Sequence, residues 1–353
     1  MKQVFKKWLE QYFSNEEAVL FSIILIISFV VLATLGSILG PFIAAVIITF
    51  LLQGLVNSLQ KYGFTRLTAV FSTYLLFLVG SVSILLLLIP IIFRQTSLLL
   101  RELPAMVAQL KELLTSFPEK LSAYVSPEQF QLILVRASEE VANLAEQLLS
   151  FSISSFPGLF AVMIYIVLVP LLVFFMLKDK NELLTLLSDM LPRERRVMTT
   201  IWDEMNMQFA NYVRGKAIEI VIVGTVSFIA FLILGLQYAA LLALLIGISV
   251  LIPYVGATVV TIPVLLVGYF QWGYSTEFVW LVVIYVVIQV LDGNVLVPLL
   301  FSEVVNLHPV AIIIAVLLFG GIWGFWGLFF AIPLATLVKA IYNAWPRNQV
   351  SKG

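Results

Sequence analysis

Long apolar runs alternate with polar segments of helical pattern along this chain of 353 residues. A membrane-spanning helix needs about 20 mainly apolar residues. Residues 18–93 hold three stretches of that length and a fourth follows, at 18–36, 38–56, 67–93 and 157–177. The first stretch is longer than the apolar core of a secretory signal and lacks a cleavage pattern, so we expect it to be retained. Ser14 and Glu17 have the spacing of a capping box, which predicts that this helix starts beside them.

The polar segments also have an apolar stripe at helical spacing. Residues 1–17 are typical of a short helix that lies in the cytoplasmic headgroup layer. Residues 94–156 hold five basic and seven acidic side chains, and we expect amphipathic periplasmic helices there, broken by Pro104, Pro118 and Pro127. Residues 178–216 are expected to form amphipathic helices on the cytoplasmic side.

Residues 217–338 form the expected transport core, and they contain no Lys or Arg. Five apolar segments can be counted there, at 217–236, 238–252, 256–272, 278–299 and 309–338. Lys and Arg are enriched in cytoplasmic loops, and their distribution here predicts that both termini, including the tail 339–353, are cytoplasmic. The number of crossings between Lys216 and Lys339 must then be even. At least one of the five segments is therefore expected to be a broken or re-entrant helix.

Glycine and proline residues indicate where the helices of this core are interrupted. One motif is VLIPYVGA (250–257) and another is FGGIWGFWG (319–327). The expected hairpin or hinge residues are Pro253, Tyr254, Gly256, Pro263, Gly320, Gly321, Gly324 and Gly327. Broken backbone at membrane depth needs protein or water to satisfy its polar groups, so such breaks commonly mark a transport site. For the second motif, close packing of small residues between helices is the competing interpretation.

Ionisable groups inside apolar runs are the candidate pathway residues, because a charge at mid-bilayer costs roughly 2.5–3.5 kcal/mol on insertion scales. Asp292 and Asn294 follow an apolar run, with Gln289 about one turn earlier. The sequence Asp-Gly-Asn predicts the end of a helix, with oxygens that bind a cation or a polyhydroxylated solute. A tight turn at the membrane interface is the alternative.

Glu303, Asn306 and His308 precede the last apolar segment. His308 is the sole histidine and a candidate proton-coupling group, because imidazole is the side chain that commonly exchanges protons at physiological pH, although a loop at the water boundary, capped by Asn306, explains the same residues. Arg214 and Lys216 fit topology anchors that reach back to water better than substrate ligands, and Glu219 is positioned to pair with either.

Composition and missing motifs exclude several classes of function. Apolar residues make up 61% of the chain and charged residues 11%, against roughly 45–50% and 25% in soluble domains. With no Cys and one His, we expect neither disulfides nor a metal site. The phosphate-binding loop of ATPases, the HExxH motif and the GxSxG motif are absent, so we expect no enzyme activity and no cofactor. A net charge of zero gives no indication of a nucleic-acid partner.

Five ordered motifs carry a family resemblance. They are LVPLLVFFMLKDK (168–180), NYVRGK (211–216), LIPYVGATVVTIP (251–263), LDGNVLVPLLFSEVVNLHP (291–309) and FGGIWGFWGLFFAIPLATLVKA (319–340). With them the chain closely resembles the autoinducer-2 exporter family, and within it the branch of PerM-like permeases. The resemblance covers nearly the whole chain and is weakest over 94–156.

The resemblance implies a bacterial inner-membrane protein with eight spans, cytoplasmic termini and a homo-oligomeric, pentameric assembly. Family members have been associated with export of the quorum-sensing furanone autoinducer-2, and others with exchange of sodium or lithium for protons. We therefore expect an all-α polytopic membrane protein with about eight transmembrane helices, at least one of them broken, plus amphipathic extramembrane helices. The expected function is secondary transport of a small polar solute. Sodium or lithium exchange for protons, a passive channel and a membrane scaffold remain alternatives.

Overall fold

The computed structural model describes residues 16–36, 38–115, 156–189, 195–253, 255–301 and 307–344, with isolated positions at 132, 135, 136, 139 and 191. Every regular element in these ranges is a helix, which confirms the all-α fold class. Five helices are long and apolar enough to cross a bilayer, or six if a bent pair of helices counts as one span. The expected headgroup helix, most of 116–155, Ser14 and the tail beyond Ala344 lie outside the described residues.

Three helices of the first half share one apolar core. α3 (Gly40–Lys61) follows α2 (Glu16–Leu35), and it packs against α4 (Arg66–Ser83) and α8 (Phe156–Lys178). The start of α4 is capped by Thr65, whose hydroxyl accepts a hydrogen bond from the Thr68 N–H. The buried core includes Ala45, Val56, Val70, Val173 and Leu177. These three helices form a scaffold, and Ile47 and Leu51 of α3 also pack against buried residues of the glycine-rich and proline-rich second half.

The helix that starts at α4 runs far past its predicted end. One π-helical turn, η1 (Ile84–Leu88), joins α4 to α5 (Ile89–Thr115) without a break. The boundary expected at residue 94 is therefore not a break in the helix. The prediction that Pro104 breaks the helix is wrong, because α5 continues through it. A proline removes one backbone hydrogen bond, and a long helix with good flanking turns tolerates that loss by bending.

The longest single α-helix among the described residues is α10 (Arg196–Leu234), whose 39 residues extend about 58 Å. It follows α9 (Lys180–Asp189), which bends by 81° from α8. The boundary expected at residue 216 lies inside α10, so a polar and an apolar segment form one element. At its start the Glu17 carboxylate accepts a hydrogen bond from the Met198 N–H (3.0 Å), a favourable position for a negative charge. The helix ends at Gly235, whose φ of 70° is typical of a glycine that terminates a helix.

The second half begins with a helical hairpin. α11 (Ala239–Ser249) has 11 residues, or about 16 Å, and cannot cross a hydrocarbon core of about 30 Å alone. A break follows α11, and α12 (Val255–Trp272) then leads back along it. The predicted interruption at VLIPYVGA is thus confirmed. The interruption expected at Pro263 is wrong, because that residue lies inside the continuous α12.

The Asp-Gly-Asn sequence does not end a helix. α13 (Thr276–Leu291) continues through a second π-helical turn, η2 (Asp292–Leu296), into α14 (Val297–Phe301). The tight-turn alternative fails for the same reason. The π turn accommodates one extra residue within the helix, and such turns are frequent at functional sites.

The last apolar segment is broken, as its glycines predict. α15 (Pro309–Trp323), α16 (Phe325–Phe329) and α17 (Ala331–Ala344) are separated at Gly324 and Phe330. Gly324 has φ 56° and ψ −129°, a conformation that side chains strongly disfavour. All three helices contact one another.

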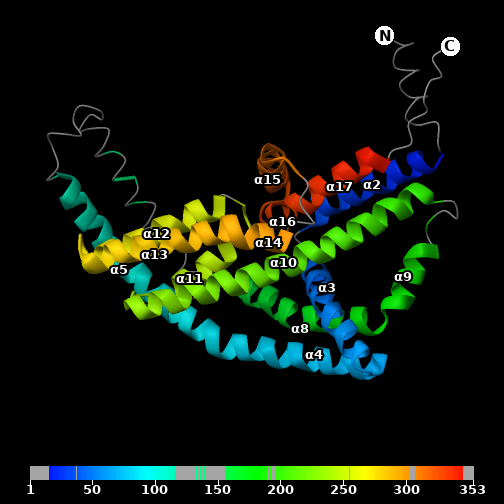
Figure 1. Cartoon of the computed structure of the whole chain (residues 1–353), viewed down its shortest axis with the longest axis horizontal. Helices are drawn as coiled ribbons and strands as arrows, with labels where there is room; N and C mark the ends of the chain where they lie inside the picture. Colours follow the sequence, from blue (N-terminus) through cyan, green and yellow to red (C-terminus); the bar gives the residue numbers. More distant parts are fainter. Residues whose placement is uncertain are drawn as a thin grey trace, which may run out of the picture.

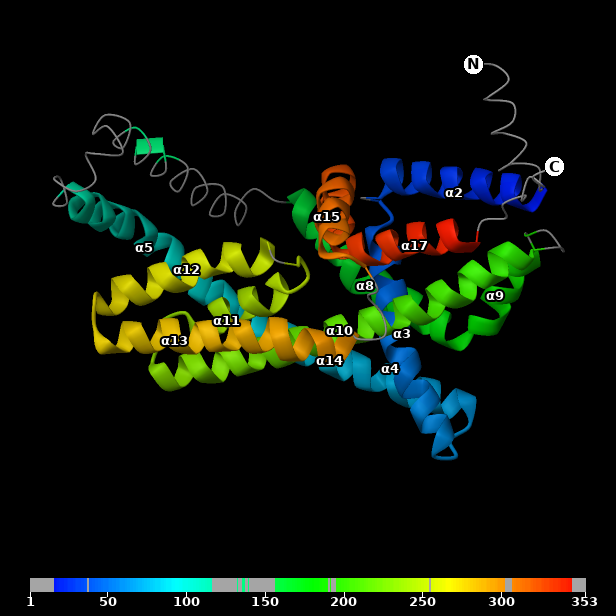
Figure 2. The same ribbon diagram turned by 45° about the horizontal axis from the view of Figure 1, so that its top comes forward.

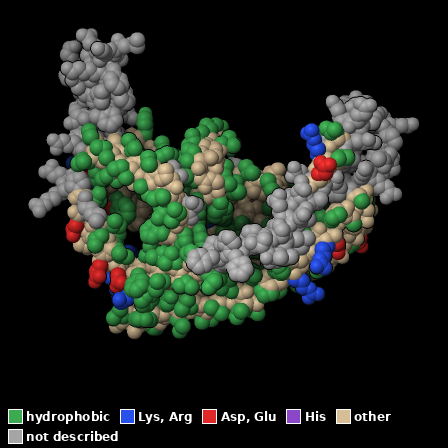
Figure 3. Space-filling view, turned by 180° about the vertical axis from the view of Figure 1, so that it is seen from behind, with side chains coloured by type: hydrophobic (Ala, Val, Ile, Leu, Met, Phe, Trp, Pro, Cys, Tyr) green, Lys and Arg blue, Asp and Glu red, His purple; other side chains and the backbone are tan. Residues whose placement is uncertain are grey.

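Figures 1 and 2 show how these elements are arranged. α11 and α13 both pack against α10, and α12 lies against α11 and α13. Their shared core includes Phe231, Leu242, Ile246, Val264 and Leu281. The ends of α5 and α10 lie toward one end of the molecule, and the start of α10 and the end of α17 lie toward the other. On the face in Figure 3, charged side chains gather at the two ends and a hydrophobic surface separates them, as expected of a multi-pass membrane protein.

α10 and α11 pack closely at Gly247, and a larger side chain there should destabilise the fold. A Cβ added at Gly247 would lie 3.1 Å from the Ile220 carbonyl oxygen and 3.3 Å from the Gly224 Cα. We expect Gly247→Leu to lower the free energy of unfolding by about 1–3 kcal/mol, because the helices would be forced apart. The matched control is Gly80→Leu, where an added Cβ meets open space. Thermal unfolding in detergent, followed by circular dichroism, should show a lower Tm for Gly247→Leu alone. Equal Tm values for both variants would contradict this packing.

Candidate functional site

One face of α10 carries three buried polar side chains. Tyr212, Lys216 and Glu219 are 1%, 5% and 2% exposed. Their spacings of four and three residues place them along one stripe of the helix. A buried ionisable side chain is costly unless it is paired, so each of these groups is expected to have a specific partner.

Lys216 binds the break between α11 and α12. Its Nζ lies 2.8 Å from Glu219 Oε2 and donates a hydrogen bond to the Val250 carbonyl oxygen at 2.7 Å. Val250 is the residue directly after α11, where the helix no longer supplies donors for its last carbonyls. The Nζ also lies 5.2 Å from the ring centroid of Phe301, close enough for a cation–π contact. Lys216 is therefore a buried structural partner of the break and does not reach back to water.

Tyr212 binds the second break in the same way. Its hydroxyl donates a hydrogen bond to the Phe329 carbonyl oxygen at 2.9 Å, where α16 ends and α17 is about to begin. Tyr212 and Lys216 are one helical turn apart. Two interrupted segments that are about 80 residues apart in sequence thus meet on one stripe of α10. Sequence reasoning missed Tyr212, although it precedes Lys216 by four residues in the motif NYVRGK.

Asp292 adds a second carboxylate to this site. The π turn η2 carries it, and its charge interacts with those of Lys216 and Glu219. Its Oδ1 is buried and has no hydrogen-bond partner among the described residues. No carboxylate oxygen of Asp292 lies within ion-pair distance of the Lys216 Nζ, so Asp292 adds its charge to the pair without a direct contact. If all three are ionised, the cluster carries one excess negative charge in a region that favours neutrality.

The other residues of the Asp292 motif do not join the cluster. Asn294 is exposed, and its Nδ2 donates to the Val290 carbonyl oxygen at 3.0 Å. Gln289 is half-buried on α13. Arg214 is also exposed, with its guanidinium near Gly54 of α3.

His308 lies at the start of α15, away from this cluster in sequence and exposed at its end. Its Nδ1 accepts a hydrogen bond from the Val310 N–H at 3.3 Å, so His308 itself occupies the capping position that Asn306 was expected to fill. Glu303, Asn306 and Tyr254 lie outside the described residues.

Glycines allow the backbone to approach closely at both breaks. A Cβ on Gly256 would overlap the Ser249 carbonyl oxygen, and one on Gly327 would overlap that of Phe319. A Cβ on Gly320 would collide with Leu328, whereas Gly321 faces open space. Pro253 lies in the turn between α11 and α12. These contacts favour close packing as the role of Gly256, Gly320 and Gly327.

Comparison with known proteins identifies relatives over the full length. The model of the AI-2E family of transporters matches residues 20–347. A protein of Escherichia coli (strain K12) named as a permease, PerM, is 40% identical, and the alignment covers 100% of both chains. A protein of Bacillus subtilis (strain 168) named as a transport protein, YueF, is 29% identical, with 86% of this chain and 82% of that protein covered. YrrI of the same organism, also named as a transport protein, is 24% identical over 85% and 84% of the two chains.

The Tyr212 contact can be tested without changing charge. Tyr212→Phe removes the hydroxyl and leaves the Phe329 carbonyl unpaired, so we expect the free energy of unfolding to fall by about 1–3 kcal/mol. Tyr62→Phe is the control, because Tyr62 is 82% exposed. Thermal unfolding measures both changes. If Tyr212→Phe were as stable as the control, the hydroxyl would not hold the second break.

Proposed function

This chain belongs to the AI-2E family of transporters, and from that premise we propose that it is a secondary transporter that exports a small polar solute, similar to autoinducer-2, across the membrane. The relatives are named as permeases or transport proteins and not as enzymes. In our proposal the solute passes the cluster of Lys216, Glu219 and Asp292. Binding of solute and of a coupling ion there would be linked through shared charges.

The observation that carries the proposal is that both helix breaks bind donors on one stripe of α10, whose charged pair interacts electrostatically with Asp292, a residue whose buried Oδ1 has no hydrogen-bond partner among the described residues. Discontinuous helices in transporters commonly surround the substrate site, because their free backbone groups bind polar ligands. Here Lys216 and Tyr212 occupy the carbonyls of Val250 and Phe329. A polar solute or ion that competes for either donor would release one break and allow that segment to move. This competition links binding to a conformational change.

The charge of the cluster favours a second candidate, exchange of sodium or lithium for protons. Two carboxylates and one ammonium group carry one excess negative charge. One proton or one monovalent cation would neutralise it. The buried Asp292 Oδ1 is the atom available to accept it among the described residues. Carboxylate oxygens are suitable ligands for hard cations and also bind protons. Export and cation exchange thus share the same cluster and differ in what crosses with the ion.

Orientation and assembly belong to the same proposal. We place the protein in a bacterial inner membrane with both termini in the cytoplasm, because Lys61, Arg66, Lys178 and Arg196 would then lie on the cytoplasmic side. We also propose a homo-oligomer, pentameric as the family implies. Its support is the apolar window of the helix over 66–106, none of which is buried within one chain, so that lipid or further copies must cover it.

Flux measurements on Asp292→Asn test this function. We expect at least about a tenfold loss of gradient-driven flux in proteoliposomes, because the amide keeps the shape but cannot exchange a proton or neutralise a cation. Glu277→Gln, an exposed acid at the other end of α13, is the matched control and should keep full flux. Proton, sodium and lithium gradients are imposed separately, with autoinducer-2 as the test solute.

The outcomes separate the alternatives. Saturable autoinducer-2 flux that needs an ion gradient supports export, and ion exchange without solute flux supports the second candidate. Flux that neither saturates nor responds to an opposing gradient would indicate a passive channel. Unchanged flux in a well-assembled Asp292→Asn protein would remove this carboxylate from the mechanism.

A further inference from the structure

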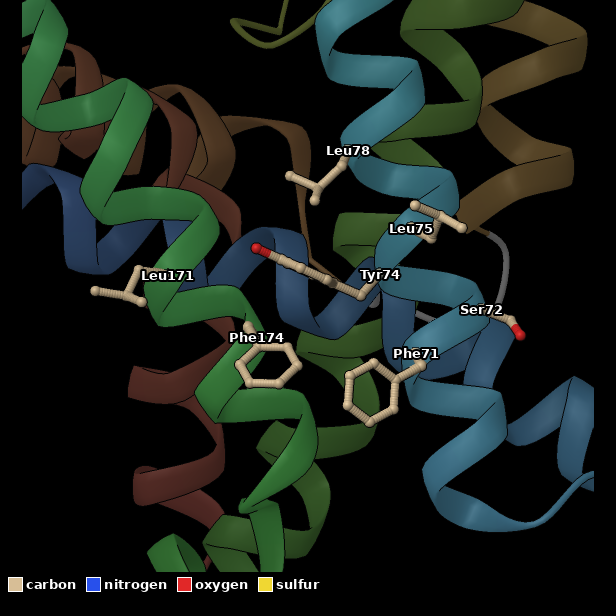
Figure 4. Close-up of a pocket in the computed structure, with 7 residues that line it drawn as sticks. All are labelled: Phe71, Ser72, Tyr74, Leu75, Leu78, Leu171 and Phe174. Carbon is tan, nitrogen blue, oxygen red and sulfur yellow. The ribbon is translucent and has the colours of Figure 1, made fainter.

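A groove lies on the outside of the first-half scaffold. Its residues are far in sequence from the α10 cluster, and they are mainly apolar where the cluster is charged. It measures about 560 Å³ and runs between α4 and α8, as Figure 4 shows. Its lining side chains are Phe71, Tyr74, Leu75, Leu78, Leu171 and Phe174, with Ser72 of α4 at its edge as the one hydroxyl besides that of Tyr74. Leu75 is 62% exposed, so this chain leaves much of the groove surface uncovered. A large apolar surface of this kind needs an apolar occupant.

Basic side chains collect at one end of the groove. Arg66 is the first residue of α4 and Lys178 is the last residue of α8. The two ends are joined, because the Arg66 guanidinium donates a hydrogen bond to the Lys178 carbonyl oxygen at 3.4 Å. Lys61 is the last residue of α3. It lies four residues before Thr65, which caps the start of α4. The groove thus has an apolar floor and a positively charged end.

These cations have little compensation from the chain itself. No carboxylate of the described residues lies within ion-pair distance of Arg66 or Lys61. Lys178 Nζ lies 3.5 Å from Asp179 Oδ1, in a pair that is partly exposed and therefore weak. An anion from outside the chain would complete the charge balance here.

Along the axis of α4, the distance from the basic residues to the groove matches the distance from the headgroup of a lipid to its acyl chain. Phe71 is five residues from Arg66, or about 7 Å along α4, and Leu78 is about 18 Å from it. One leaflet of the hydrocarbon core is about 15 Å thick. A phosphate held by Arg66 would therefore place its acyl chain alongside Phe71, Leu75 and Phe174 within the same leaflet.

We propose that this groove is a binding site for an anionic phospholipid, with its phosphate bound by Arg66 and Lys178 and one acyl chain in the groove. Basic pockets between transmembrane helices on the cytoplasmic side are typical sites for anionic headgroups. The lipid would join α4 to α8 and so stabilise the scaffold that supports α10. The site is independent of what the transporter carries.

Lipid binding can be measured on the purified full-length protein. Phosphatidylglycerol and phosphatidylcholine of the same acyl composition are added to detergent-purified protein, and native mass spectrometry counts the retained molecules while thermal unfolding gives Tm. We expect phosphatidylglycerol to be retained preferentially and to raise Tm. Arg66→Gln/Lys178→Gln should reduce its retention at least about tenfold, the loss expected from two charge-assisted contacts. The control is Arg101→Gln, an exposed arginine on α5 that should leave retention unchanged.

A second variant tests the apolar part of the site. Leu75→Trp fills the groove without altering charge, and it too should reduce phosphatidylglycerol retention. Equal retention of both lipids, or retention insensitive to Arg66→Gln/Lys178→Gln, would overturn the proposal. A second copy of the chain is the competing occupant. Because the sequence has no Cys, Leu75→Cys gives a single reactive position, and efficient disulfide cross-linking between copies through it would also overturn the lipid assignment.

Discussion

Peptide groups inside a bilayer must find hydrogen-bond partners within the protein, and this constraint organises the second half of the chain. A break in a helix frees carbonyl oxygens that lipid cannot bind. Among its described residues, the second half has two such interrupted segments, at α11–α12 and at α15–α17, and each offers a carbonyl to a donor on α10. Lys216 donates a hydrogen bond to the Val250 carbonyl, and Tyr212 donates one to the Phe329 carbonyl. The backbone of the long, uninterrupted α10 forms its hydrogen bonds within the helix. Its side chains are therefore available as donors to both breaks.

The same constraint explains why charge is concentrated at this point. An ammonium group has three donors, so Lys216 can bind the Val250 carbonyl and still pair with Glu219. Gly215 leaves room for the Phe301 ring beside it, since a Cβ there would collide with that ring. The price is an ion pair in a poorly solvated place, where removing one partner leaves a costly unpaired charge. In our proposal Asp292 makes the cluster sensitive to protons or cations, because a single lysine cannot neutralise two carboxylates.

The two halves of the molecule differ in the continuity of their helices and in where their polar contacts lie. The scaffold of α3, α4 and α8 is apolar and exposed over much of its surface, and in our proposals lipids or other copies of the chain cover it. The second half is broken and holds its polar contacts inside. α10 joins the two, because it contacts α3 on one side and α11, α13 and α17 on others.

The sequence by itself determined the helical membrane class and the two main breaks, but the boundaries expected at residues 94 and 216 lie inside continuous helices. The class and the breaks follow from local properties: apolar length, glycine and proline positions, and the requirement for internal hydrogen bonds. It also carried the family motifs. Local pattern overestimated the effect of single prolines, since Pro104 and Pro263 lie inside helices that tolerate one lost bond. The end predicted at Asp292 was a π turn, which sequence pattern does not distinguish from a helix end.

Only the tertiary structure decided where the polar side chains point. Lys216 was expected to reach water, but helix packing buries it against Val250. Asp292 and Asn294 are two residues apart, yet one turns toward α10 and the other away, because successive helical positions about 100° apart face different neighbours. Tyr212 gains its role only when α16 and α17 fold back on α10. Such contacts join residues far apart in sequence, and they depend on which helix faces meet.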